Sequence, residues 1–435
     1  GTDLTIHPRF KEWIRWHMYT LVTAATWKEE DFHTYTPPQG AHAREVPSPE
    51  HSEWQDLFFQ LVEGIGPGDL ELADNFLWAL TRGKRGHKPN LESVLFKDYG
   101  AVLRYDFGGS DEAYLNIQQI NSWTGTWNGY RLWGSMNYRW GGRGNGILYY
   151  AANDKIWSWN GVEENGDKFD IHELPVFNVD QKGLMYHETD GILYNFNEIQ
   201  FYRANGSNPA YFSRDVMMVR DDYIGIYDNV SEDVNGEFQW INPYWEMPAI
   251  HKIKENTGDN LHVVEPRTQP LYQVSKTSYG TKLWNTGGVE HVFMADRLQS
   301  VEQDDLTFIG RTAYACKDML AIFEGTSLHY RDFALELTGQ GFAASLKILG
   351  DGNISGRIAG NGSGHIIITL PNDLSTDNRN IYINGKKVRH RTKGQKIIFK
   401  CEANIKDGYY STYDIITGHD SPTPVPEHPE LYIRK

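Results

Sequence analysis

The chain has 435 residues, with 42 Lys and Arg against 57 Asp and Glu, so its formal net charge is −15. This length exceeds what one small hydrophobic core holds, and two domains are expected. The acidic balance argues against nucleic acid as a partner, because a phosphate backbone needs a broad basic surface. No apolar run approaches the ~18–20 residues of a membrane-spanning helix, so no membrane partner is expected.

The first ninety residues are expected to be helical. Apolar residues recur at helical spacing from Phe10 to Val22. Ser52 opens a capping box, Ser-Glu-Trp-Gln, and a third helix is predicted over 69–82. A long loop over 31–51 separates the first two helices. Loops of that length in compact proteins are usually functional or disordered.

From about Leu91 the apolar period changes to two, which predicts strands. Asn384-Gly385 between two short apolar runs predicts a hairpin with a type I′ turn. Strands follow strands without intervening helices, so the fold class is α+β: a helical domain over 1–90, then a large antiparallel β-sandwich over 91–435, with room for a smaller sheet from about 340. The segments predicted as strands are 101–106, 147–150, 216–220, 223–227, 291–294, 320–323, 344–349 and 365–370.

No acidic residue occurs between Glu112 and Asp154, and we call residues 113–153 the acid-free segment. In a chain of this net charge, such a local excess of cations and aromatic rings predicts a binding surface. Flat rings stack on sugar faces, and guanidinium groups grip carboxylates or sulfates. The segment therefore points to an anionic carbohydrate, and its predicted contact residues are Trp123, Trp127, Arg131, Trp133, Asn137, Arg139, Trp140 and Arg143. Packing of the same rings in a sheet core is the alternative.

Two places carry residue types suited to proton transfer. Tyr35, His42 and Arg44 lie in the loop after the first helix, where Tyr and His are competent proton carriers and Arg stabilises negative charge. Tyr138 lies between Asn137 and Arg139, and neighbouring guanidinium groups favour the phenolate, which lowers the pKa of the phenol. The alternatives are a solvated loop without a role and cation–π packing in a strand.

The remaining reactive residues predict less. His187 is a candidate substrate contact, but no His-x-His or Cys-x-x-Cys pair supports a metal site, so no metal and no cofactor are expected. Cys316 and Cys401 allow at most one disulfide. The absence of a Gly-x-Ser-x-Gly elbow argues against an α/β-hydrolase.

Several segments together resemble a known family. They are Gln39-Gly-Ala-His-Ala-Arg, Gly144-Asn-Gly-Ile-Leu-Tyr-Tyr, His291-Val-Phe-Met-Ala-Asp, Ile383-Asn-Gly-Lys-Lys-Val and the strand pair from Arg214 to Val230. The chain resembles the C-terminal part of polysaccharide lyases built from an (α/α) toroid and an antiparallel β-supersandwich, heparinase II/III-like first and chondroitin AC lyase-like second. It departs from the heparinase pattern at 138–145, where a His-rich loop is usual, which puts the sheet histidine and a structural divalent metal in doubt.

The resemblance implies β-elimination on a uronic-acid-containing polysaccharide by a secreted or periplasmic enzyme. Arg44, Asn137 or Arg139 would neutralise the uronate carboxylate, and Tyr35, Tyr138 or His42 would move the protons. The helical part is shorter than a whole toroid, so we expect a truncated or processed chain whose missing helices come from elsewhere in a precursor. A glycoside hydrolase with two carboxylates and a non-catalytic carbohydrate-binding protein are the alternatives; the oligomeric state is left open.

Overall fold

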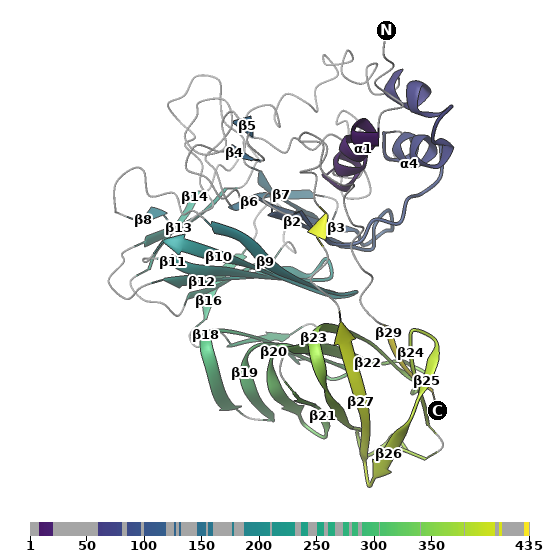
Figure 1. The fold of residues 1–435 in the computed structure, drawn as a ribbon. Helices are drawn as coiled ribbons and strands as arrows, with labels where there is room; N and C mark the ends of the chain where they lie inside the picture. The colour runs from purple at the N-terminus through teal and green to yellow at the C-terminus, as the bar shows by residue number, and fades with distance from the viewer. Residues whose placement is uncertain are drawn as a thin grey trace.

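The structure is a computed structural model, drawn in Figure 1. It describes residues 8–20, 60–80, 85–96, 100–118, 126–127, 130–131, 146–153, 155–159, 176–177, 187–208, 211–230, 236–241, 250–255, 260–265, 273–277, 281–285, 289–303, 305–339, 341–377, 379–404, 409–410 and 430–434. Its helical part holds α1 (Pro8–Thr20), a helical stretch over 60–65 and α4 (Leu70–Leu80). These pack through Ile14, Met18, Ile65 and Phe76. Asp69 caps α4, because its Oδ1 accepts a 3.1 Å hydrogen bond from the Leu72 amide.

Among the described residues, two six-stranded sheets follow the helices. The first sheet has the order β28-β1-β2-β3-β6-β7, and the central sheet has the order β16-β15-β12-β11-β10-β9. The first comprises β1 (Val94–Phe96), β2 (Gly100–Tyr105), β3 (Ala113–Gln118), β6 (Gly146–Ala152), β7 (Lys155–Trp159) and β28 (Tyr409–Tyr410). The central sheet comprises β9 (His187–Phe196), β10 (Ile199–Asn208), β11 (Tyr211–Val219), β12 (Tyr223–Val230), β15 (Asn260–Glu265) and β16 (Gln273–Thr277).

The third sheet has twelve strands among the described residues. They are β17 (Thr281–Asn285), β18 (Val289–Gln303), β19 (Leu306–Ala315), β20 (Met319–Tyr330), β21 (Phe333–Thr338), β22 (Phe342–Ile348), β23 (Ile354–Thr369), β24 (Asn380–Ile383), β25 (Lys386–Val388), β26 (His390–Lys393), β27 (Lys396–Asn404) and β29 (Glu430–Arg434). Two small sheets complete the described strands: β4 (Thr126–Trp127) with β5 (Tyr130–Arg131), and β8 (Val176–Phe177) with β13 (Gly236–Ile241) and β14 (Ile250–Glu255).

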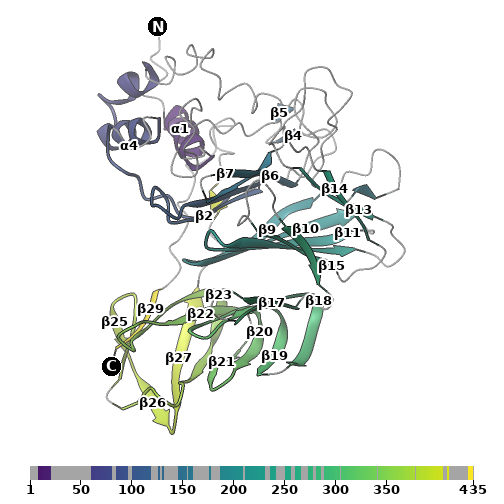
Figure 2. The ribbon, with the colours of Figure 1, turned by 180° about the vertical axis from the view of Figure 1, so that it is seen from behind.

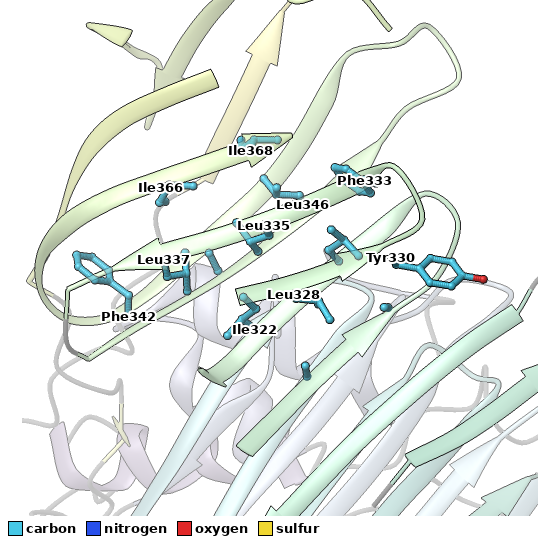
Figure 3. Close-up of a cluster of buried hydrophobic side chains, with 14 of the residues drawn as sticks. Ile322, Leu328, Tyr330, Phe333, Leu335, Leu337, Phe342, Leu346, Ile366 and Ile368 are labelled. Carbon is cyan, nitrogen blue, oxygen red and sulfur yellow. The ribbon is translucent and has the colours of Figure 1, made fainter. Parts of the chain in front are cut away.

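The three large sheets stack in layers, as Figures 1 and 2 show. The central sheet is buried on both faces. On β11 and β12, Met218 and Ile224 face the first sheet, whereas Met217 and Tyr223 face the third. A third core fills the curved third sheet, with Leu335 at 0% exposure among other apolar side chains (Figure 3). Burial on both faces explains why these central strands read as near-continuous apolar runs.

The fold class is therefore α+β, a short helical part followed by a large antiparallel β-sandwich, as the sequence predicts. β1 and β28 are a parallel pair at the margin of the first sheet. Apart from β28, the described strands after residue 340 belong to the same twelve-stranded sheet as β17–β21.

The predicted hairpin at 384–385 is confirmed. β24 and β25 pair with Ile383 opposite Lys386, and the turn residues Asn384 and Gly385 have φ of 49° and 71°. Two consecutive positive φ angles define a type I′ turn.

Replacing Gly385 with alanine is expected to lower the free energy of unfolding by roughly 1–2 kcal/mol, because an L-residue is strained in the left-handed region. A Cβ at Gly385 meets no atom within 4 Å, so no steric clash adds to the backbone strain. Gly350→Ala is the matched control: it also meets no atom within 4 Å and its φ is not positive. Urea unfolding of both variants measures the difference. Equal stabilities of the two variants would contradict the prediction.

In the part of the chain that the structure describes, no helix is long and apolar enough to span a membrane.

Candidate functional site

The middle of the acid-free segment, residues 119–145, connects two neighbouring strands of one sheet. It leaves the first sheet at the end of β3 and returns at the start of β6, and these strands are antiparallel neighbours with Gln118 opposite Gly146. The two ends of residues 119–145 are therefore fixed side by side. Connections longer than about 15 residues between neighbouring elements are uncommon in compact domains and are usually functional or disordered.

Few of the predicted site residues lie where the structure can place them. Trp127 and Arg131 belong to the small hairpin β4–β5, in which Trp127 is opposite Tyr130 and Thr126 is opposite Arg131. His187 is the first residue of β9, opposite Gly206 on β10. The other predicted site residues lie outside the described residues: Tyr35, His42, Arg44, Trp123, Trp133, Asn137, Tyr138, Arg139, Trp140 and Arg143.

β3, which begins the acid-free segment, has two different faces. Leu115 and Ile117 pack in the core between the first and central sheets. Tyr114 and Asn116 alternate with them and lie on the opposite face, where the Asn116 side-chain amide donates a 3.1 Å hydrogen bond to the Tyr114 hydroxyl. This second face carries polar groups although both side chains are fully buried.

Arg104 on β2 is the centre of that polar face. Its Nη1 donates to Glu112 Oε1 at 3.1 Å, and its Nη2 donates to the Tyr19 carbonyl of α1 at 2.8 Å. The guanidinium carbon also lies 4.6 Å from the centre of the Tyr114 ring. The cluster thus joins the helical part to the strand pair β2–β3, whose second strand begins the acid-free segment.

Burial governs the ionisation of this cluster. It lowers the pKa of Arg104 below its usual value, although the Glu112 carboxylate acts in the opposite direction. Burial likewise raises the pKa of the Tyr19 phenol, and the Arg104 charge offsets part of that increase. Sequence reasoning did not single out these residues. The available signal was one arginine in the apolar run Ala101-Val-Leu-Arg-Tyr of β2.

A second group of buried charges lies between the central and third sheets. Arg203 on β10 binds Asp215 on β11 with two hydrogen bonds, Nε to Oδ1 at 2.7 Å and Nη2 to Oδ2 at 2.6 Å. Its Nη1 also binds Glu324 on β20, and Arg311 on β19 lies 3.8 Å from Asp215. Burial lowers the pKa of Arg203, but Asp215 and then Glu324 reverse this, and the net direction is upward. Each of these charged groups has a partner of opposite charge within the cluster, so their arrangement indicates a structural connection between the two sheets.

The two cysteines are free and buried. Burial raises the pKa of the Cys316 thiol to about 12 and that of Cys401 to about 11, both from a usual 9.0. Neither thiol is a nucleophile at neutral pH, because the reactive species is the thiolate.

Both thiols of the folded protein are therefore expected to stay unreacted with a chromogenic disulfide reagent at pH 8. After denaturation in urea, both should react and release two equivalents of the chromophore. Because both folded pKa values are raised, the stabilisation from keeping the thiols protonated is full below pH 9 and is lost as the pH rises to about 11–12. Absorbance of the released chromophore, compared between the folded and the urea-denatured protein at pH 8, gives the measurement. Rapid labelling of the native protein at pH 8 would contradict the prediction.

Within the described residues, no group of three or more His, Cys, Asp or Glu side chains is placed to hold a metal ion.

Comparisons with known proteins give fold neighbours alone. No family model and no curated protein matches the chain. Among solved structures, the heparan sulfate lyase HepC from Pedobacter heparinus is similar at 11% identity and a TM-score of 0.31, over 94% of this chain and 44% of that one. A heparinase III is similar at 12% identity and a TM-score of 0.29, over 87% and 41%. The chain thus spans less than half the length of these solved structures.

Proposed function

We propose that this chain belongs to a polysaccharide lyase that cleaves a uronic-acid-containing anionic polysaccharide by β-elimination, and that it is exported to reach this polymer. One observation carries the proposal. A segment rich in Arg, Trp and Tyr, without any acidic residue, is inserted between two neighbouring strands of a chain whose net charge is −15. Cations and flat rings in one place suit a ligand that is both anionic and a sugar.

The elimination asks for three things from the protein. The uronate carboxylate must be neutralised, because its charge opposes the carbanion that forms at C5. A base removes the C5 proton, the electron pair forms the C4–C5 double bond, and the bond from C4 to the glycosidic oxygen breaks. An acid then protonates the leaving oxygen. The candidates for neutralisation are Arg44, Asn137 and Arg139, and those for proton transfer are Tyr35, His42 and Tyr138.

The described part of the chain supports this role as scaffold. Arg104 bonds to α1 and to Glu112 next to β3, so the strand that begins the acid-free segment is tied to the helical part. A site that must orient a flexible polymer benefits from such a rigid support.

Incubation of the full chain with a panel of uronic-acid polysaccharides tests the proposal. The expected result is a product that absorbs in the near ultraviolet, because elimination leaves a conjugated double bond. A glycoside hydrolase would release reducing ends without this absorbance, and a binding protein would release neither. Either of these two outcomes over the whole panel would overturn the lyase assignment.

A further inference from the structure

A second stretch without acidic residues lies on the described surface. No Asp or Glu occurs between Asp377 and Glu402. The structure describes nearly all of this stretch, as β24, β25, β26 and β27 of the third sheet. It carries the basic residues Arg379, Lys386, Lys387, Arg389, Arg391, Lys393, Lys396 and Lys400.

Four of these basic residues recur at every second position: Lys387 on β25, Arg389 between the two strands, and Arg391 and Lys393 on β26. Val388 packs against the core of the third sheet, His390 is opposite the buried Phe399, and Thr392 is opposite the buried Ile397. These three residues alternate with the basic ones; Val388 and His390 are partly buried, and Thr392 is exposed. Strand neighbours point to opposite faces. We call the four basic residues the cationic row: Lys387, Arg389, Arg391 and Lys393, all exposed.

The charges of the cationic row are not neutralised within the described part of the protein. Two nearby lysines, in contrast, form ion pairs. Lys396 Nζ lies 2.8 Å from Glu336, and Lys400 Nζ lies 2.7 Å from Glu402. No carboxylate of the described residues forms an ion pair with any member of the row. Successive members are about 7 Å apart along an extended chain. Such spacing suits an extended polymer with regularly repeated negative charges.

The row also has an aromatic neighbour. Tyr382 on β24 is directly opposite Lys387 on β25, so both side chains stand on the same face. The Tyr382 side chain is partly exposed. A partly exposed ring beside a cation offers a stacking surface for a sugar, next to a group that binds its carboxylate or sulfate.

Edge protection is the competing explanation for this charge. β25 pairs with β24 alone and β26 with β27 alone, so both are edge strands among the described residues. Proteins place lysine on such edges to prevent sheet-to-sheet aggregation. Edge protection requires charge on the edge but no regular order, whereas this stretch repeats a basic residue at every second position from 387 to 393.

We propose that the cationic row is a binding site for a linear anionic polysaccharide, separate from the acid-free segment. The choice of a polysaccharide over other polyanions rests on the proposed function. A net charge of −15 opposes close approach of duplex DNA or an anionic membrane over a broad area, while a single row of cations accommodates one thin chain. β25 and β26 lie at the end of the molecule opposite α1 and α4 (Figures 1 and 2). The row would therefore bind a part of the polymer far from the part held near the helices.

The test uses the full chain and three fluorescent probes: dextran sulfate, neutral dextran and a duplex DNA oligonucleotide. Dextran sulfate contains no uronic acid, so its binding is independent of any lyase activity. The test variant carries Lys387→Gln, Arg389→Gln, Arg391→Gln and Lys393→Gln. The matched control removes four exposed charges from other surfaces by changing Lys88, Arg297, Lys317 and Arg331 to Gln.

The expected result is salt-dependent binding of dextran sulfate by the wild type and the control, with neutral dextran unbound, and affinity weakened at least about tenfold in the test variant. Where a uronate polymer is cleaved, its KM should rise in the test variant while cleavage of a short oligosaccharide is unchanged. Failure of the lyase assay leaves the dextran sulfate result intact, so the two proposals fail separately.

Equal binding by the test variant and the wild type would overturn the proposal. So would aggregation of the test variant with normal binding by its monomer, because that outcome identifies edge protection. DNA binding as tight as that of dextran sulfate would reject the polysaccharide as the partner.

Discussion

Replacing Asp215 with asparagine is expected to lower the free energy of unfolding by about 3–5 kcal/mol, because a buried cation then loses its counter-charge. Asp215 is fully buried, and its carboxylate accepts two hydrogen bonds from Arg203, whose side chain is 6% exposed. Arg311, which lies 3.8 Å from the Asp215 carboxylate, would also lose this counter-charge, so two neighbouring guanidinium groups would repel each other. Among the described carboxylates, Glu324 would then be the remaining counter-charge for both guanidinium groups, and its side chain is 41% exposed.

The midpoint of urea unfolding, followed by far-ultraviolet circular dichroism, measures this loss. Glu402→Gln serves as the control, because Glu402 and Lys400 form an exposed ion pair and its loss should leave the stability nearly unchanged. The double variant Arg203→Met, Asp215→Leu should be more stable than Asp215→Asn, since it removes both charges together. A loss below about 1 kcal/mol for Asp215→Asn would contradict the assigned role of this pair.

Replacing Tyr138 with phenylalanine is expected to lower kcat on a uronate polymer by roughly 10²–10⁴-fold, the usual contribution of one positioned acid or base. The change removes only the hydroxyl that would take or give the proton. KM should stay nearly constant, because the ring available for stacking remains. Initial rates of near-ultraviolet absorbance give both constants.

Tyr130→Phe is the matched control for this prediction. Tyr130 lies in the same acid-free segment, on β5 opposite Trp127, and it is not among the candidate acids and bases. It should keep nearly full activity. Full activity of Tyr138→Phe would move the proton-transfer role to Tyr35 or His42, and their substitution would then decide the assignment.

Local patterns predicted local structure well. Asn384-Gly385 predicted its turn because two positive φ angles suit few other residue pairs. The strands predicted over 216–220 and 223–227 belong to β11, which ends at Val219, and to β12, which begins at Tyr223. Asp69 was placed at the start of the third helix, where it caps α4.

Long-range pairings could not be predicted in this way. Arg203 and Asp215 are brought together by the β10–β11 hairpin, but Glu324 joins them from a different sheet, 121 residues after Arg203. Alternation identifies the two faces of a strand but not the layer that each face meets. The candidate site has the same difficulty. Its predicted residues are divided among the loop over 31–51, the acid-free segment and His187 on β9, and only tertiary packing brings such distant parts of the chain together.

The position of β29 has a consequence for how the protein is made. β29 lies between β23 and β24, pairing Ile433 with Ile354 on one side and with Ile381 on the other. During translation, β24 and β25 emerge well before the strand that bridges them to β23. The third sheet therefore reaches its final strand order only after residue 434 has left the ribosome, and until then the hairpin that leads into the cationic row lacks its neighbour.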